Sequence, residues 1–292
     1  MNRFSLQIPP EYDGKDIKFI IQNHFKLSKK MMTRLKKDNG ILLNGRKEFV
    51  TKAVHTGDTL LLSPPNEVSE NIVPENIPLE ILYEDEYIYA VNKPANMPTH
   101  PSINHYSGTL ANACAYHFRD TPFTFRAITR LDRDTTGVVL LAKNAHCAYL
   151  LSKSMQEGKI QKEYNALCVG IPAKSAGNIV APIAREQEGV IKRCVSPNGK
   201  YAKSIYETLS EKDGFSFIRL MPLTGRTHQL RVHLSYIGTP IYGDFLYGSE
   251  IDKERTRLHC RSITFEHPIS GKKMTISAPV PDDMNLNLFI GC

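Results

Sequence analysis

The sequence has no uninterrupted apolar run of about 18 residues, the length that a membrane-spanning helix needs. Residues 1–10 also lack the continuous apolar core of a secretory signal peptide. We therefore expect a protein that acts in the cytoplasm and has no membrane partner.

The six cysteines form no C-x-x-C pair, and their spacings suit neither zinc nor an iron–sulfur cluster. Most have apolar neighbours, as Cys168 has in Leu167 and Val169. These neighbours favour free, reduced thiols, most of them buried.

Sequence motifs for metals, nucleotides and serine nucleophiles are missing as well. There is no H-E-x-x-H, and His228 and His233 are five residues apart, a spacing that separates them on a helix. No glycine-rich phosphate loop and no G-x-S-x-G elbow occurs. We expect neither a metal nor a cofactor, and serine hydrolysis loses support.

The net charge of +7 is concentrated at one end of the chain. Residues 1–65 contain 12 Lys and Arg against 6 Asp and Glu, whereas residues 66–292 contain 25 against 24. A basic segment attached to a nearly neutral body suggests that one part holds a polyanion and the other processes it. Charge alone supports equally well a basic surface that only keeps the protein soluble.

The basic segment has its own pattern of predicted elements. Apolar residues at helical spacing predict a first helix that includes Ile17, Ile20, Ile21 and Phe25. Ser28 is predicted to cap a second helix over residues 29–37. Three cations of this second helix share one face, namely Lys30, Arg34 and Lys37.

A strand over residues 41–43 then meets Asn44-Gly45, a strong signal for a β-hairpin, and Gly57-Asp58 leads into a closing strand. This order of two helices, a strand, a turn and a strand resembles the S4 RNA-binding domain over residues 27–63. The resemblance implies that the basic second helix and the following turn contact RNA phosphates. The alternative is a small helix–hairpin module without a ligand.

The remaining elements define the expected domains and fold class. A polar, proline-containing stretch predicts a linker over residues 66–78, between a domain over 1–65 and a catalytic domain over 79–292. Helices do not alternate regularly with strands, which favours an α+β fold with a mixed, largely antiparallel sheet and flanking helices. Strands are predicted over 81–83, 87–91, 138–142, 162–169, 201–208 and 215–221, and helices over 110–118, 145–157 and 230–237.

Four polar segments stand out as carriers of chemistry: residues 92–101, 130–137, 162–166 and 223–233. In the second, Asp132 and Asp134 lie close to Arg130 and Arg133. A carboxylate beside arginine stays ionised at neutral pH and can act as a nucleophile, a base or a cation ligand. A structural ion-pair network is the interpretation that this segment favours by itself.

The four segments, in this order and spacing, resemble the RluA/RluD family of pseudouridine synthases over residues 79–281. The resemblance rests on the motifs R-L-D-x-x-[TS]-G, K-x-Y-x-A and G-R-T-H-Q. It implies that Asp132 is catalytic, that Tyr164 stacks on the target base and that Arg226 pairs with Asp132. It also implies that Leu230 lines the pocket. We expect Arg130 to contact the substrate together with Lys30, Arg34 and Lys37.

Two positions depart from the family pattern. The family has histidine before R-L-D, where this chain has Thr129. In the proline-containing first segment, Asn96 stands where the family often has glycine. Asparagine tolerates a positive φ better than other residues with a side chain, so the loop can keep its shape.

The implied reaction breaks the N1–C1′ bond of uridine and forms a C5–C1′ bond. This isomerisation is redox-neutral, in agreement with the missing cofactor motifs. Attack by Asp132 on C1′, attack on C6 and action as a base all stay open. We expect RNA as the partner, with rRNA favoured over tRNA because of the S4-like part, and a monomer because no heptads occur.

Two other classes of function are weighed against this one. A non-catalytic RNA-binding assembly factor on the same fold would be signalled by loss of Asp132, Tyr164 or Arg226, and all three are present. An RNA hydrolase or methyltransferase lacks the metal set or nucleotide loop that it needs.

Overall fold

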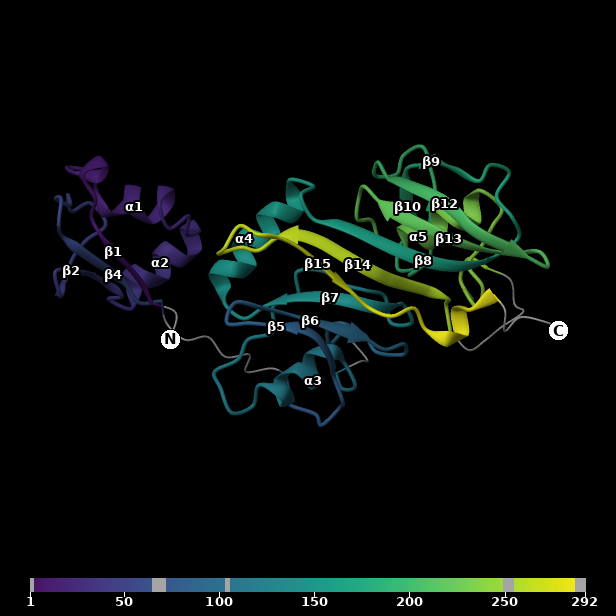
Figure 1. Cartoon of the computed structure of the whole chain (residues 1–292), viewed down its shortest axis with the longest axis horizontal. Helices are drawn as coiled ribbons and strands as arrows, with labels where there is room; N and C mark the ends of the chain where they lie inside the picture. Colours follow the sequence, from purple (N-terminus) through teal and green to yellow (C-terminus); the bar gives the residue numbers. More distant parts are fainter. Residues whose placement is uncertain (1–2, 65–71, 103–105, 249–254, 287–292) are drawn as a thin grey trace.

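The computed structural model describes residues 3–64, 72–102, 106–248 and 255–286. Figure 1 shows a small N-terminal part beside a larger part built on one long, twisted sheet. The helices are α1 (Ile17–Asn23), α2 (Lys29–Lys37), α3 (Leu110–His117), α4 (Ala145–Gln156) and α5 (Gln229–Tyr236), with short 3-10 helices η1 (Pro10–Tyr12) and η2 (Asp282–Met284).

In the N-terminal part, β1 (Phe4–Gln7), β2 (Ile41–Leu43), β3 (Arg46–Lys47) and β4 (Thr59–Leu62) form an antiparallel sheet in the order β1-β4-β2-β3. The Ser28 side chain accepts a hydrogen bond from the amide of Met31, which confirms the predicted cap of α2. Asn44 and Gly45 both have positive φ, as the predicted hairpin turn requires. Strand β1 was not predicted; it pairs with β4 at the sheet edge.

The large sheet has nine strands and confirms the α+β expectation of a mixed, largely antiparallel sheet. Its order is β5-β6-β7-β14-β8-β13-β12-β9, with β15 beside β14. Every pairing is antiparallel except that of β7 with β14. The strands are β5 (Glu80–Glu84), β6 (Ile88–Lys93), β7 (Thr136–Ala142), β8 (Gln161–Val169), β9 (Ala176–Val180), β12 (Lys203–Lys212), β13 (Phe215–Pro222), β14 (Leu258–Glu266) and β15 (Lys273–Ser277).

Sequence patterning missed β14, although it is central to the sheet. Polar residues interrupt its apolar pattern. They can be buried because they hydrogen-bond to other parts of the protein and not to solvent. His259, for example, is fully buried and its Nδ1 lies 2.9 Å from Oγ1 of Thr136. The edge strands β9 and β15 and the small hairpin of β10 (Ile183–Arg185) and β11 (Arg193–Val195) were also not predicted.

The two parts have separate hydrophobic cores, one beneath each sheet. They meet at the start of α4, where Ala145 packs against the N-terminal core and the Phe4 ring lies edge-on to His146, with ring centroids 5.2 Å apart. Of the expected linker, residues 66–71 lie outside the described residues, whereas Ile72 and Ile77 pack against the large core. No described helix is both long and apolar enough to span a membrane.

Gly137 lies where β7 and β14 run parallel and their backbones come together. Its φ is +107°, and a Cβ at this position would overlap the backbone of Cys260. Only glycine fits this conformation and this close approach. The loop that carries Asp132 therefore enters the sheet at a position that accepts no side chain.

We predict that Gly137→Ala lowers the free energy of unfolding of the large part by about 3 kcal/mol or more, because backbone strain and steric overlap add. Gly271→Ala is a matched control, since Gly271 also has a positive φ (+68°) but no atom lies within 4 Å of the place that an added methyl group would take. That control should lose about 1 kcal/mol. Equal losses for both variants in urea unfolding would contradict the role of the close approach between β7 and β14.

Candidate active site

An open pocket of about 310 Å³ lies in the large part, between the loop before β7 and the turn before α5. Five of the residues predicted from the sequence line it, namely Arg130, Asp132, Tyr164, Arg226 and Leu230. The other three predicted substrate contacts, Lys30, Arg34 and Lys37, lie on α2 in the N-terminal part. Three of the four polar segments therefore line the pocket, and the first segment, residues 92–101, lies behind it.

This first segment, the proline-containing loop after β6, fixes the Asp132 loop from behind. Lys93 is fully buried, and its ammonium donates to the carbonyl oxygens of Pro94 (2.7 Å), Met97 (2.8 Å) and Arg133 (2.9 Å). The Met97 amide also donates to the carbonyl of Arg133. One cation therefore ties the two loops together through three carbonyl groups.

The burial of Lys93 has an electrostatic consequence. Loss of solvation lowers the pKa of Lys93 to about 7, although the carboxylates of Asp134 and Asp132 oppose this effect.

Thr99 makes a second tie, because its hydroxyl donates to the Leu131 carbonyl and accepts from the Leu131 amide. Asn96 adopts a φ of +56°, so the expectation that asparagine replaces glycine in this loop is confirmed.

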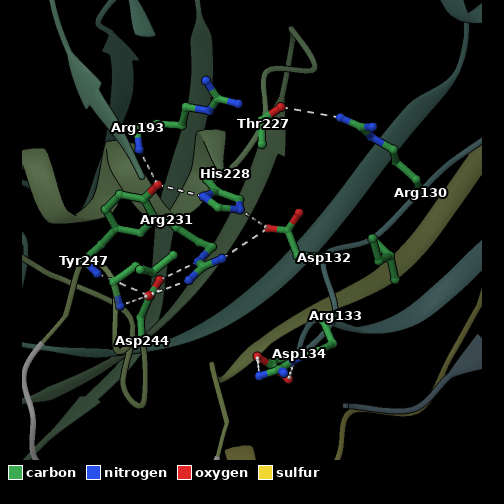
Figure 2. Close-up of polar contacts among 12 residues, drawn as sticks. Arg130, Asp132, Arg133, Asp134, Arg193, Thr227, His228, Arg231, Asp244 and Tyr247 are labelled. Atoms are coloured by element: carbon green, nitrogen blue, oxygen red, sulfur yellow. Dashed lines mark hydrogen bonds and ion pairs between the residues drawn. The ribbon is translucent and has the colours of Figure 1, made fainter. Parts of the chain in front are cut away.

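Asp132 faces a buried arginine at the start of α5 (Figure 2). Nη1 of Arg231 lies 3.5 Å from Oδ2 of Asp132, and the Asp132 side chain is 35% exposed. The same guanidinium donates from Nε and Nη2 to both oxygens of Asp244, at 2.6 and 2.7 Å. Asp244 is fully buried, so it orients Arg231 from inside the protein and leaves Nη1 available to Asp132.

The expectation that Arg226 pairs with Asp132 is wrong. Arg226 is exposed at the rim of the pocket, and its Nε donates to the carbonyl of Tyr201 at 2.9 Å. The reason is its place in the turn before α5, outside the helix, whereas Arg231 lies on the buried helix itself. Both arginines belong to the same predicted segment, 223–233, so the motif located the site but selected the wrong side chain.

His228 also faces Asp132, with its Nε2 3.9 Å from Oδ2. Its Nδ1 lies 2.7 Å from the hydroxyl of Tyr247, and that hydroxyl accepts from the amide of Arg193 (Figure 2). The Tyr247 hydroxyl thus connects the His228 ring to the backbone of Arg193 in β11. Burial lowers the pKa of His228, while Asp132 opposes the effect, so the neutral ring is favoured.

Tyr164 forms part of the pocket wall from β8 and is 7% exposed. Burial raises the pKa of its hydroxyl well above the ordinary value, and the thiol of Cys260 and the carboxylate of Asp132 add to this. The side chain is therefore a neutral phenol at physiological pH. Leu230 and Leu258, both buried, supply apolar surface next to it.

The turn before α5 is fixed by one buried glutamine, Gln229. Its Oε1 accepts from the amide of Arg226 and the hydroxyl of Thr224, at 3.0 and 2.8 Å. Its Nε2 donates to the carbonyl of Lys203 and to Oγ of Ser204. The side chain thus joins the turn to β12 and holds the rim of the pocket in place.

The positions around Asp132 have local structural roles. Thr129, which replaces the family histidine, accepts from the amide of Leu140 at 3.0 Å and so attaches the loop to β7. Arg130 lies across the pocket, with its Nη2 3.4 Å from Oγ1 of Thr227. Asp134 pairs with the adjacent Arg133 at 3.1 Å.

The histidines in this part of the chain hydrogen-bond to other side chains, and the described cysteines are free. His233 lies 3.0 Å from Oγ of Ser204, and His267 pairs with Asp85 at 2.9 Å. Within the described ranges, no group of three or more His, Cys, Asp or Glu is placed to hold a metal ion. Four cysteines are buried and free and Cys194 is half-buried and free, while Cys292 lies outside the described residues.

Residues 87–236, just over half of the chain, match the sequence profile described as RNA pseudouridylate synthase. The chain belongs to this family. As an RNA pseudouridylate synthase it is an isomerase that acts on RNA and makes pseudouridine. Residues 4–60 match the RluD ribosomal pseudouridine synthase N-terminal domain, so the family assignment extends to the small basic part.

Individual relatives agree with this assignment over nearly the whole chain. The uncharacterized RNA pseudouridine synthase YjbO of Bacillus subtilis is 38% identical over 89% of this chain and 93% of its own length. The ribosomal large subunit pseudouridine synthase D of Pseudomonas aeruginosa is 33% identical over 95% and 92%. The solved structure of human RNA pseudouridylate synthase domain containing 1 is 29% identical, with a TM-score of 0.60 over 70% of this chain and 84% of that one.

Sequence reasoning missed five residues of this candidate site: Lys93, Arg231, Asp244, Tyr247 and His228. The first two lie within predicted polar segments, but no pattern in α5 distinguishes Arg231, because the buried residues of this helix also include Gln229 and His233. Asp244 and Tyr247 lie in an irregular stretch without periodicity, so no sequence pattern connects them to the site.

The two arginines make separable predictions. Arg231→Lys removes the two-oxygen pairing with Asp244 and should lower kcat by about 100-fold, because Asp132 is no longer held in a fixed orientation. Arg226→Lys is the matched control and should leave kcat within about threefold while raising KM, since its side chain lies only at the rim. Release of tritium from C5 of labelled uridine in RNA measures both constants. A larger drop in kcat for Arg226→Lys would overturn the assignment made from the geometry.

Proposed function

We propose that this enzyme isomerises specific uridines of structured RNA through the carboxylate of Asp132, without a cofactor, and that rRNA is its substrate ahead of tRNA. The observation that carries the proposal is the contact of a partly exposed Asp132 with buried Arg231 at the edge of a pocket. The rRNA preference rests on the N-terminal match and on relatives named ribosomal large subunit pseudouridine synthase D.

We assign different roles in the reaction to the carboxylate of Asp132 and to the neutral phenol of Tyr164. The N1–C1′ bond breaks, the uracil turns, C5 bonds to C1′, the proton on C5 leaves and N1 gains a proton. An ionised carboxylate can act as the nucleophile or remove the C5 proton, and Arg231 and His228 hold that of Asp132 at the edge of the pocket. Tyr164, with its raised pKa, is unsuited to remove a proton at neutral pH.

We assign Tyr164 and Leu230 to the target base. A uridine in folded RNA must leave its stack to reach the pocket, which costs a few kcal/mol. Stacking on an aromatic ring returns about 1–3 kcal/mol per base, and the apolar wall at Leu230 adds to the contact. Arg130 and Arg226, at the exposed rim, are placed to bind phosphates on either side of the target.

We further propose a division of labour between a binding domain over 1–65 and a catalytic domain over 79–292, with 66–78 between them. The separate cores and the unequal charge support this division. Lys30, Arg34 and Lys37 on α2 would bind RNA phosphates. Because one chain supplies every group that the proposed chemistry uses, the enzyme would work as a monomer, and an rRNA substrate would place it in the cytoplasm.

Asp132→Asn should abolish pseudouridine formation and leave RNA affinity within about twofold, because it removes the charge and keeps the shape. The measurement is a map of pseudouridines in rRNA and tRNA from cells that lack the enzyme, complemented with wild type or variant. Wild type should restore rRNA sites that the variant does not. Sites restored by the variant would contradict the role of Asp132 and favour an assembly factor. Sites restored only in tRNA would refute the rRNA preference.

Replacing Lys30, Arg34 and Lys37 by glutamine should weaken RNA binding and reduce the salt dependence of log K by about one for each phosphate that is no longer neutralised. The control removes the same charge from exposed lysines of the catalytic domain, Lys174, Lys272 and Lys273. Binding is followed by fluorescence anisotropy of labelled RNA between about 50 and 200 mM salt. Equal salt slopes for the two triple variants would remove the proposed role of α2.

A further inference from the structure

The N-terminal part contains a groove of about 340 Å³ that the proposed chemistry does not use. It runs between the C-terminal end of α2 and residues 47–51, which begin at the last residue of β3. Its floor is apolar, formed by the buried side chains of Leu35, Ile41 and Val50. A polar residue, Asn39, lies at the end of α2 beside this floor.

Phe49 lines the same groove and is 82% exposed. The exposure is fixed by the fold, because the backbone around Phe49 is tied on both sides. The carbonyl of Phe49 accepts from the amide of Lys52, and the carbonyl of Val50 accepts from the amide of Lys18. A large aromatic ring on a rigid turn, next to an apolar groove, is a surface suited to a flat partner.

The charges at the groove select the class of partner. Lys36 and Lys47 line it, and neither forms an ion pair with any residue that the structure describes. Glu48 is the one acidic group among the described lining residues, so the cations outnumber it. The exposed cations Lys37 and Arg46 stand next to these lysines in the chain. The surrounding segment, residues 1–65, carries six of the seven excess positive charges.

We propose that this groove binds an unpaired nucleotide of the RNA substrate, with its base against Phe49 and its neighbouring phosphates beside Lys36 and Lys47. The proposal rests on the proposed RNA substrate and adds to it. Aromatic stacking accepts any unpaired base, while cations hold the backbone, a combination typical of single-strand binding. A base-paired duplex offers no free base face to the ring. The N-terminal domain would therefore recognise a single-stranded element near the target uridine, in addition to phosphates along α2.

The composition of the chain allows a direct test. It contains no tryptophan, so Phe49→Trp introduces a single fluorescent reporter into the full-length enzyme. A single-stranded RNA oligonucleotide should quench this emission on binding, and the same sequence in a perfect duplex should not. Ile269→Trp, at an exposed site in the turn between β14 and β15, is the control and should respond to neither RNA.

Affinity separates the stacking and charge contributions. Phe49→Ala should weaken single-stranded RNA binding by about 5- to 100-fold with an unchanged salt slope. Lys47→Gln should reduce the salt slope by about one. Thermal unfolding checks that the exposed Phe49 is not needed for folding, and Phe49→Trp should retain the wild-type affinity.

The outcomes distinguish this proposal from the proposed function. Quenching of Phe49→Trp by single-stranded RNA supports the groove even if no rRNA site is found. Absence of quenching, with pseudouridine formation intact, overturns the groove and leaves the function standing. Equal quenching by duplex overturns the unpaired-nucleotide assignment. Quenching by RNA-free ribosomal protein, and not by RNA, would show that the groove takes a protein segment instead.

Discussion

One buried guanidinium links the inside of this enzyme to the carboxylate of Asp132, the proposed reacting group. Arg231 gives two of its donors to Asp244, which is shut away from solvent, and a third to Asp132, which is not. A buried charge pair is stable only when both partners are satisfied, so Asp244 and Arg231 fix each other's position. The buried Asp244–Arg231 pair therefore sets the orientation of the partly exposed Asp132 carboxylate. Asp132 needs no rigid packing of its own, and its open side stays free for RNA.

The opposite face of the Asp132 loop is held by a different kind of contact. Lys93 donates to three backbone carbonyl oxygens, so its partners are peptide dipoles and not a carboxylate. The loop is thus fixed from behind by the buried Lys93 amino group and in front by the Arg231 guanidinium. His228, whose Nε2 lies 3.9 Å from Oδ2 of Asp132, completes the set. Together these contacts hold the Asp132 carboxylate in place.

Local chemistry explains which parts of the structure the sequence predicted. Ser28 and Asn44-Gly45 act on the next few residues, so helix α2 and the β2–β3 hairpin were predicted correctly. Strand β14 was missed because its polar residues are satisfied by distant strands, a fact that no local window contains. The motifs located the pocket correctly but selected the wrong arginine within their last segment. They record which segments meet, whereas the choice between Arg226 and Arg231 depends on where α5 begins. Asp244 was not predictable, since only the fold brings it to Arg231.

The single parallel pairing of the sheet has a consequence for how the enzyme is made. Strand β14 lies between β7 and β8, although it follows them both in the chain. Its pairing with the start of β7 joins residues 123 positions apart. Pairings of such sequence separation form late in folding. A growing chain that already contains Asp132, Tyr164 and Arg231 still lacks the strand that sets the spacing of β7 and β8. The site around Asp132 can therefore be completed only after β14, residues 258–266, has been synthesised.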